Sequence, residues 1–321
     1  MQKTGIVIRN TGSRYDVLDD NDNKIISCAV KGSFRIKGIR TTNPVAVGDR
    51  VDVLISDNGN DDSAYITGIH PRNNYIIRRA SNLSKEAHIL AANVDCAMLV
   101  VTLSNPTTST TFIDRFLATA AAYGVEAIIV INKIDLLDDA EDREFLRAFR
   151  YLYESVGYTV MEVSALTGNG IDELRKYLIG KVTLLSGNSG VGKSSIINRL
   201  IPGLSLRTAN ISDVHNSGVH TTTFSQMFPL PDGGWIIDTP GVKGFGTLEM
   251  DKREVDHFFP EIFSTSRQCR FDDCSHTGEP GCAVLEAIEE NRIARSRYSS
   301  YLSILEDTMQ PSGSDKYRKP Y

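Results

Sequence analysis

The order of two short motifs constrains the fold of this chain more than any other feature of its sequence. Asn132-Lys133-Ile134-Asp135 follows an apolar run at 127–131, and Gly187-Asn188-Ser189-Gly190-Val191-Gly192-Lys193-Ser194 follows a second apolar run at 182–186. Both runs have the length of buried strands, and a helical pattern begins after the second motif. Loops that follow parallel strands meet at one edge of a sheet whatever the order of the strands in the chain. The two motifs can therefore form a single site.

The second motif has the form of a phosphate-binding loop between a strand and a helix. Its glycines let backbone N–H groups approach phosphates, and the helix N-terminus favours their negative charge. We expect Lys193 to reach the β- and γ-phosphates, where it also has a catalytic role, and the Ser194 hydroxyl to bind Mg²⁺. The residues that this motif predicts to bind the nucleotide are Gly187, Asn188, Ser189, Gly190, Val191, Gly192, Lys193, Ser194 and Ser195.

The first motif predicts that the base is guanine. A carboxylate at Asp135 can accept hydrogen bonds from N1–H and from the 2-amino group, neither of which adenine offers. We expect Asn132 at the opposite edge of the base and the stem of Lys133 over the ring. Ser164 and Ala165 follow the next apolar run and match a loop whose backbone contacts the guanine oxygen. Ordinary GTPases carry the phosphate loop first, so the order in this chain indicates a circularly permuted GTPase.

Two later segments supply the predicted magnesium site and γ-phosphate contacts. Asp238-Thr239-Pro240-Gly241 follows an apolar run, and we expect Asp238 to hold Mg²⁺ through water while the Gly241 N–H contacts the γ-phosphate. A run of three threonines at 221–223 resembles a loop that closes over the ion. Any of the three could be the ligand, and Thr222 is our preferred candidate for magnesium binding and for a catalytic role.

The residue that positions the attacking water is predicted to be unusual. Val242 stands where Ras-like enzymes have a glutamine, and an apolar side chain cannot orient water. His220 is the nearest candidate, because a neutral imidazole can orient or accept a proton from water at pH 7. A histidine that merely lies on the surface of the loop is the alternative.

A third group of residues predicts a metal site. The spacing Cys-x4-Cys-x-His-x5-Cys places three thiols and one imidazole close together, as in a closed structural zinc site with no open position for catalysis. The chain has five cysteines, an odd number that argues against a disulfide framework. Cys28 and Cys96 are expected in the core. The predicted zinc ligands are Cys269, Cys274, His276 and Cys282.

The pattern of apolar residues divides the chain into three predicted domains. Residues 1–72 contain five short alternating runs separated by Asn, Asp and Gly, which favours a small barrel of the OB type. Residues 73–247 alternate between strands and helices, which favours a doubly wound sheet. Residues 248–321 are polar and carry the cysteines, then a helix near 283–305 and a tail from 310 that we expect to be disordered. Zinc is expected to stabilise this last domain, which is too small to be stable on burial alone.

The charge distribution limits the possible partners. The net charge is −5, so any contact with nucleic acid must come from local basic patches. The segment 31–40 is basic around Phe34, and a second group of arginines surrounds the predicted metal site; solvated surface is the alternative interpretation of both. No apolar run has the length of a membrane span and the N-terminus lacks an apolar signal region, so we expect a cytoplasmic protein that does not contact membranes. The basic residues concerned are Lys31, Arg35, Lys37, Arg40, Arg267, Arg270, Arg292, Arg295 and Arg297.

Taken together, these motifs resemble the ribosome small-subunit-dependent GTPase A family (RsgA, also called YjeQ) over essentially the whole chain. The resemblance implies a multidomain fold: an N-terminal OB-fold β-barrel, a central α/β circularly permuted P-loop GTPase domain, and a C-terminal zinc-binding helical domain. One position differs, since Val219 stands where many members have an arginine before the histidine.

The same resemblance implies a function. It is that of a GTP hydrolase that acts as a late maturation factor of the small ribosomal subunit, binds ribosomal RNA and is stimulated by the subunit. One structural Zn²⁺ and Mg²⁺ with GTP or GDP are the implied cofactors, and we expect a monomer. Two alternatives remain open: an RNA-binding scaffold with a GTP-gated conformation and little turnover, and a GTPase acting on tRNA or in a stress pathway.

Overall fold

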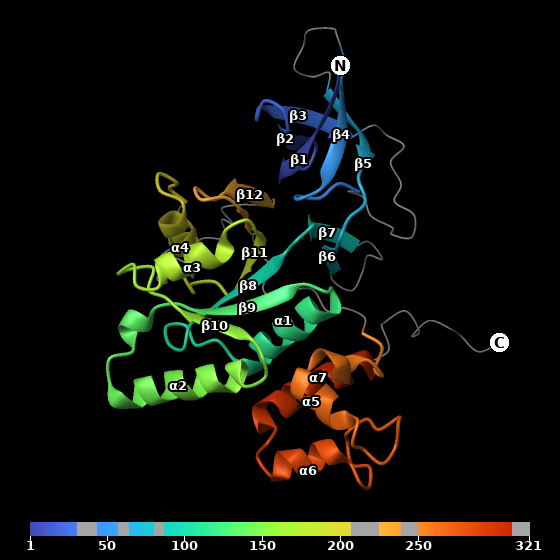
Figure 1. Cartoon of the computed structure of the whole chain (residues 1–321), viewed down its shortest axis with the longest axis vertical. Helices are drawn as coiled ribbons and strands as arrows, with labels where there is room; N and C mark the ends of the chain where they lie inside the picture. The colour runs from blue at the N-terminus through green and yellow to red at the C-terminus, as the bar shows by residue number, and fades with distance from the viewer. Residues whose placement is uncertain (31–43, 57–63, 80–86, 207–224, 239–249, 310–321) are drawn as a thin grey trace, which may run out of the picture.

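The computed structural model describes residues 1–30, 44–56, 64–79, 87–206, 225–238 and 250–309. These residues form an elongated molecule in which a small barrel lies at one end, an α/β region in the middle and a helical region at the other end (Figure 1). None of the helices among the described residues is long and apolar enough to cross a membrane.

The barrel closes through five strands, β1 (Gln2–Asn10), β2 (Tyr15–Asp19), β3 (Ile25–Val30), β4 (Arg50–Ile55) and β5 (Ala64–Ile69). Strand β1 pairs with both β2 and β4, β2 pairs with β3, and the parallel pair of β3 and β5 completes the circuit to β4. Alternate residues point inward, as in β2, where Tyr15, Val17 and Asp19 are buried. The predicted five-stranded barrel is confirmed, and Cys28 lies in its core as expected.

The central region is built on a mostly parallel sheet in the order β10-β9-β8-β11-β13-β12. Its strands are β8 (Cys96–Val101), β9 (Glu126–Ile131), β10 (Thr159–Glu162), β11 (Val182–Ser186), β12 (Gln226–Pro229) and β13 (Trp235–Asp238). All of these except β12 coincide with apolar runs of the sequence, because strands buried on both faces carry continuous apolar residues. Strand β8 is buried throughout, with Cys96 in the core.

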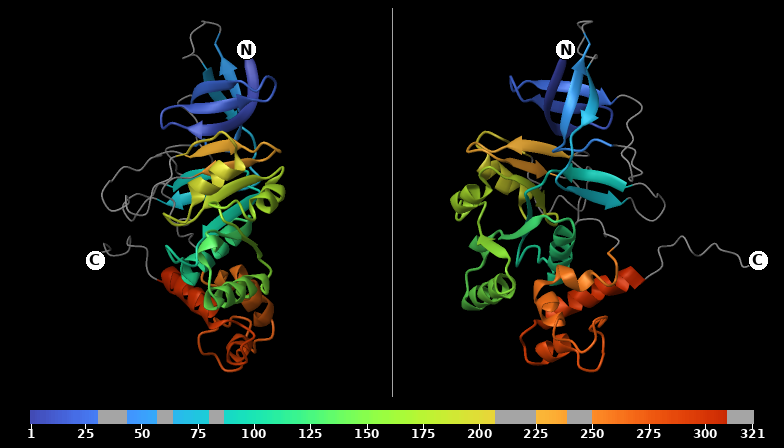
Figure 2. Two further views of the ribbon diagram at one scale, coloured as in Figure 1. Left: turned by 90° about the vertical axis from the view of Figure 1, so that its left-hand side faces the viewer. Right: turned by 45° about the vertical axis from the view of Figure 1, so that its right-hand side comes forward.

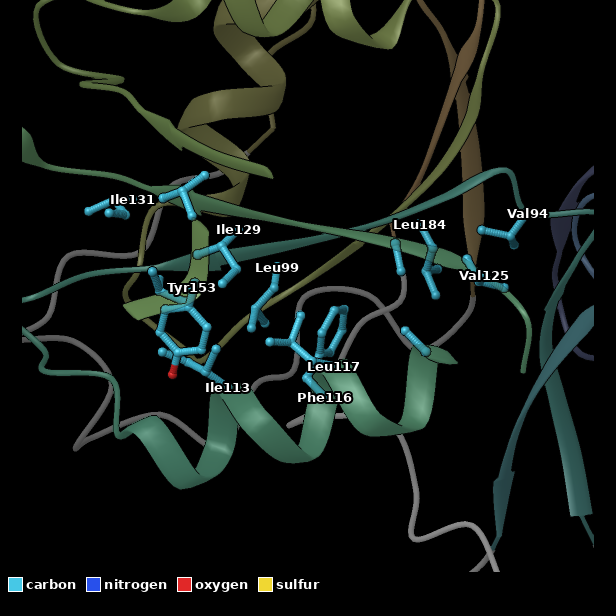
Figure 3. Close-up of a cluster of buried hydrophobic side chains, with 14 of the residues drawn as sticks. Val94, Leu99, Ile113, Phe116, Leu117, Val125, Ile129, Ile131, Tyr153 and Leu184 are labelled. Atoms are coloured by element: carbon cyan, nitrogen blue, oxygen red, sulfur yellow. The ribbon is translucent and has the colours of Figure 1, made fainter. Parts of the chain in front are cut away.

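Helices cover both faces of this sheet. The helices α1 (Thr110–Ala122) and α2 (Ala140–Glu154) pack on one face, and α3 (Ile171–Leu178) and α4 (Lys193–Leu200) pack on the other. Figure 3 shows how Ile113, Phe116 and Leu117 of α1 point toward Leu99 and Ile129 of the sheet. Their spacing places them on one side of the helix, so burial of this stripe attaches α1 to the sheet.

The junction between barrel and sheet was not predicted. A hairpin of β6 (Tyr75–Arg79) and β7 (Ala87–Ala92) follows the barrel. Strand β12 runs antiparallel to β13 and also meets β1 of the barrel, where Arg9 lies opposite Gln226. The barrel and the central sheet are thereby continuous. The four residues of β12 are too few to give a clear period in the sequence.

The C-terminal region contains the short 3-10 helix η4 (Val255–Phe258) and the helices α5 (Pro260–Ser266), α6 (Ala283–Glu289) and α7 (Arg295–Met309). The single helix predicted near 283–305 is wrong, because α6 ends before α7 begins. Asn291 adopts the left-handed conformation with φ 59°, and the Arg292 N–H bonds back to the Ala287 carbonyl. This is a hydrogen-bonded helix end of the kind that glycine or asparagine forms.

Candidate functional site

The phosphate-type loop is packed so closely that two of its positions admit only glycine. A Cβ atom at Gly187 would lie 2.4 Å from the carbonyl oxygen of Val100, and one at Gly192 would lie 2.3 Å from Nδ2 of Asn132. Both residues also have a positive φ, 144° and 94°. The loop is thereby pressed against the end of β8 and against the Asn132–Asp135 motif, which brings the two sequence motifs together.

Lys193 lies at the start of α4 and is turned back into the loop. Its Nζ donates to the carbonyl oxygens of Gly187 at 2.7 Å and Asn188 at 2.8 Å. Burial lowers the pKa of the Lys193 amine while Asp238 opposes this, and burial raises the pKa of the Asp238 carboxyl while Lys193 opposes it. An anionic phosphate beside Lys193 would favour the charged amine, and a cation beside Asp238 would favour the charged carboxylate. Each would offset the effect of burial, so these residues fit a bound phosphate and a magnesium ion. Ser194 and Ser195, both half-buried, follow directly in α4.

Asn132 joins three loops of the site. Its side chain is 3% exposed; Nδ2 donates to the carbonyl of Val191 at 2.8 Å, and Oδ1 accepts from the N–H of Ala165 at 3.0 Å. An amide nitrogen carries two protons, so one remains for a ligand. Asn132 therefore holds the phosphate-type loop, its own motif and the loop after β10 in one arrangement.

The other two residues of this motif are also fixed by neighbours. Lys133 has φ 65°, and its amine donates to the carbonyl of Asn105 in the loop after β8. Burial lowers the pKa of this amine, with Asp135 acting in the opposite direction. The hydroxyl of Ser164 donates to the Asp135 carboxylate. This bond holds one carboxylate oxygen and orients the group that we expect to face the base.

Several predicted site residues cannot be placed. Segments 207–224 and 239–249 lie outside the described residues, as do the basic segment 31–40 and the tail from 310. Their assignments therefore remain predictions from sequence. They include His220, Thr222 and Gly241.

The four predicted metal ligands do converge. The ligand atoms of Cys269, Cys274, His276 and Cys282 all lie within 4.8 Å of one another. The sulfurs of Cys269 and Cys282 are 4.0 Å apart, and Nδ1 of His276 lies 3.7 Å from the first and 3.5 Å from the second. Tetrahedral zinc with sulfur at about 2.3 Å requires ligand separations of about 3.8 Å. The donor set and its dimensions fit a metal ion of this kind.

The electrostatics of the cluster agree with that interpretation. Burial raises the pKa of the Cys274 thiol to about 12, and burial also raises the pKa of Cys282. Thiolates are thus disfavoured here unless a cation is bound, which is what a metal supplies. The His276 ring is 1% exposed, and its Nε2 has no hydrogen-bond partner among the described residues; the Asp256 carboxylate is 3.7 Å away.

Two tyrosines of α7 donate hydrogen bonds to the backbone of the metal-binding segment. The hydroxyl of Tyr298 donates to the His276 carbonyl at 2.6 Å, and that of Tyr301 donates to the Ser275 carbonyl at 2.9 Å. His276 itself has φ 60°. The backbone of this segment is therefore fixed by hydrogen bonds from α7, in addition to any metal ion that its side chains bind.

One basic residue that the sequence analysis placed in an exposed patch is buried. Arg297 is 1% exposed and donates to Asp114 of α1 at 2.8 Å and to Glu261 of α5 at 2.7 Å. Its prediction as part of an exposed positive patch is wrong, because α7 turns this residue inward. Arg267, Arg270, Arg292 and Arg295 are exposed, and Arg292 forms an ion pair with Glu290 at the surface.

Sequence reasoning missed these ion pairs because Asp114 and Glu261 both lie far from Arg297 in the chain. Arg297, Ser300, Tyr301, Ile304 and Leu305 share the buried face of α7 at helical spacing. A charged residue on an otherwise buried stripe is the signal that could have shown that Arg297 has a buried partner.

Comparison with known proteins extends these observations. The family model described as the RsgA N-terminal domain matches residues 4–66, and that of the RsgA GTPase matches residues 69–248. A Bacteroides fragilis protein named small ribosomal subunit biogenesis GTPase RsgA is 56% identical over 317 residues, 99% of each chain. A Porphyromonas gingivalis protein of the same name is 57% identical over 321 residues, again 99% of each.

Solved structures agree. YjeQ from Thermotoga maritima superposes with a TM-score of 0.76 at 35% identity, covering 97% of this chain and 99% of that one. YloQ, described as a circularly permuted GTPase, gives 0.72 at 26% identity, covering 100% and 97%. The likeness spans the barrel, the central sheet and the metal-binding region alike. The chain therefore belongs to the RsgA GTPase family.

Proposed function

We propose that this protein hydrolyses GTP to GDP and phosphate and acts in the maturation of the small ribosomal subunit. The observation that carries the first part is the position of Asn132, whose amide joins the phosphate-type loop to the loop of Ser164 and Ala165. A site that fixes both a phosphate cradle and a guanine-reading motif suits a guanine nucleotide. The second part rests on relatives of 56–57% identity over the whole chain, which carry the name of a small ribosomal subunit biogenesis GTPase.

In this site the chain's own residues have distinct roles. Lys193 binds the β- and γ-phosphates and balances the charge that develops in transfer, and the backbone of the loop surrounds the phosphates. Asp135 selects guanine through its carboxylate. Ser194 and Thr222 would bind Mg²⁺ directly and Asp238 would hold it through water, and the ion would neutralise phosphate charge. His220 orients the attacking water, in place of the glutamine that Val242 replaces, and the Gly241 N–H contacts the γ-phosphate.

The ends of the molecule bind the partner. We propose that the barrel, with its basic segment 31–40, and the zinc-binding region, with exposed Arg267, Arg270 and Arg295, contact ribosomal RNA on either side of the GTPase domain. Zinc is the proposed metal of the cysteine cluster, since three sulfurs and one imidazole in tetrahedral dimensions match its preference. The protein works as a cytoplasmic monomer in this proposal.

The test is GTP turnover measured with and without purified small ribosomal subunits. We expect subunits to stimulate hydrolysis at least tenfold, which is about 1.4 kcal/mol of barrier. Large subunits and ATP serve as controls and should give no stimulation. Lys193→Ala should abolish turnover in both conditions, which excludes a contaminating enzyme. Turnover without any response to small subunits would leave a GTPase and remove the ribosomal assignment.

A further inference from the structure

The loop between β10 and α3 has two backbone N–H groups that donate to no acceptor among the described residues. The N–H of Ser164 bonds to Asn169, that of Ala165 to Asn132, that of Thr167 to the Ser164 hydroxyl and that of Gly168 to the Ser164 carbonyl. The N–H of Asn169 has a long bond of 3.4 Å to the Thr167 hydroxyl. Among the described residues, none accepts from the N–H of Leu166 or from that of Gly170, and of the two it is Leu166 that directly follows the Ser164 and Ala165 positions expected at the base. Because Leu166 is exposed, water can accept from its N–H in the free protein, and a ligand oxygen that replaces this water would keep the hydrogen bond.

Arg199 of α4 holds the peptide that carries this donor. Its Nε donates to the carbonyl of Ala165 at 2.8 Å and its terminal nitrogen donates to the carbonyl of Leu166 at 2.5 Å. In a trans peptide the C=O and the following N–H point in opposite directions. Binding of the Ala165 carbonyl by Arg199 therefore turns the Leu166 N–H to the side away from Arg199.

Side-chain packing does not fix this peptide. The side chain of Leu166 is 74% exposed, so it contributes little to holding the backbone in place. The guanidinium instead forms a two-pronged contact with successive carbonyls, a geometry to which arginine is suited and lysine is not. Arg199 lies on the helix that begins at Lys193 of the phosphate-type loop, so one rigid element carries both the phosphate-binding residue and the support of the base loop.

We propose that Arg199 is a positioning residue for base specificity, which aims the Leu166 N–H at the base. The inference rests on the proposed function and deepens it. The ligand class is a purine with an oxygen at C6, as in guanine and hypoxanthine. Adenine has an amino group there, so the Leu166 donor would meet another donor, and the mismatch leaves both unpaired.

The experiment compares the dissociation constants of GDP, IDP and ADP for the wild-type protein, Arg199→Ala and Arg199→Lys. IDP keeps the oxygen at C6 and lacks the 2-amino group that Asp135 reads, so it separates the two contacts. Arg199→Ala should raise the dissociation constants of GDP and IDP by the same factor, about tenfold, which is about 1.4 kcal/mol. The dissociation constant of ADP should not change. Arg199→Lys keeps one donor nitrogen, so its dissociation constants should lie between those of the wild type and of Arg199→Ala. Turnover at saturating GTP should be unchanged, because the chemistry at the phosphate is untouched.

Arg175→Ala is the matched control. Arg175 donates to the Arg199 carbonyl and pairs with Asp172, yet it makes no bond to the loop. The affinity of the Arg175→Ala variant for GDP should equal that of the wild type. Equal weakening of GDP, IDP and ADP by Arg199→Ala, or no weakening of GDP, would overturn the role of Arg199. Wild-type protein that binds ADP as tightly as GDP would instead contradict the proposed function.

Discussion

At the scale of single residues, Glu279 holds the metal-binding segment in shape. One carboxylate oxygen accepts from the N–H and hydroxyl of Ser275, and the other accepts from the N–H groups of Thr277 and Gly278. Burial alone would raise the pKa of this carboxyl, but the hydrogen bonds from Ser275 and the backbone outweigh it and hold the pKa at about 2. The folded-state value is below the unfolded one, so this stabilisation is present above pH 4.5 and is lost as the pH falls toward 2.

Replacing one of these oxygens tests that role. Glu279→Gln presents an NH₂ group to donors on one side, so two bonds are lost and we expect a cost of about 1 to 3 kcal/mol. The variant should lose zinc to a competing chelator faster than the wild type and have a lower thermal midpoint at pH 7. Glu286→Gln, on the exposed side of α6, is the control and should behave as the wild type. Equal zinc retention in both variants would show that Glu279 has no such role.

Residues with local signals were predicted from sequence, and residues with distant partners were not. The four metal ligands converge as their spacing indicates, because ligands only a few residues apart need only one tight turn. The phosphate-type loop and the Asn132–Asp135 motif likewise lie together. Arg199 and Arg297 were missed or misplaced, since the atoms they bind are more than thirty residues away and no local pattern names them.

At the scale of elements, the docking of α7 on α1 depends on Arg297. Its guanidinium pairs with Asp114, which is fully buried, and with Glu261, and lies 4.8 Å from the ring centre of Phe259. Burial raises the pKa of the Asp114 carboxyl, and the charge of Arg297 opposes this. Arg115 of α1 adds an ion pair with Asp307 and a bond to Ser303. The hydrogen bonds and ion pairs named here thus attach the C-terminal region to α1 of the GTPase domain.

Removal of Arg297 should therefore be costly. Arg297→Met leaves the Asp114 carboxylate buried without its partner, and we expect a loss of about 3 to 5 kcal/mol in the free energy of unfolding. The double variant with Asp114→Asn should recover part of this, because the fully buried carboxylate is gone and only that of Glu261 is left without its partner. Denaturant titration measures the free energy of unfolding of the single and of the double variant. The control is Arg295→Met on the exposed side of the same helix. A loss no larger than that of the control would mean that the ion pair does not stabilise the interface.

Elements with a long or fully apolar pattern were predicted well. Five of the six strands of the central sheet coincide with apolar runs of the sequence, and helices lie between them as expected. The errors fall on β12, on the hairpin β6–β7 and on the break at Asn291. Strand β12 is short, and the break depends on a left-handed asparagine whose hydrogen bonds only the folded chain shows.

At the scale of the whole molecule, the barrel and the C-terminal region lie at opposite ends of the GTPase domain (Figure 2). The barrel joins the central sheet through β1 and β12. The C-terminal region contacts α1 through Asp114 and Arg115, and α2 through the ring of Tyr153. These contacts lie on the face of the sheet that α1 and α2 cover. Among the described residues, no hydrogen bond or ion pair joins the metal cluster to the phosphate-type loop, which precedes α4 on the other face.

This separation predicts what metal removal does. Cys274→Ser, or chelation of the wild type, should release about one zinc per chain and loosen α5 and α6, because a region this small depends on its metal for stability. The nucleotide site should remain assembled, so turnover without ribosomal particles should stay within about twofold of the wild type. Stimulation by small subunits should fall at least tenfold, or require much higher subunit concentrations, because one of the two proposed RNA contacts is lost.

Subunit titrations of GTP turnover distinguish these outcomes. Zinc added back to the chelated wild type should restore stimulation, which separates metal loss from damage to the chain, and it should not restore Cys274→Ser. If basal turnover collapses together with stimulation, the metal region supports the nucleotide site directly and the independence argued from the two faces of the sheet is wrong. If stimulation survives metal loss, the barrel alone binds the subunit, and the C-terminal region must serve the fold rather than the partner.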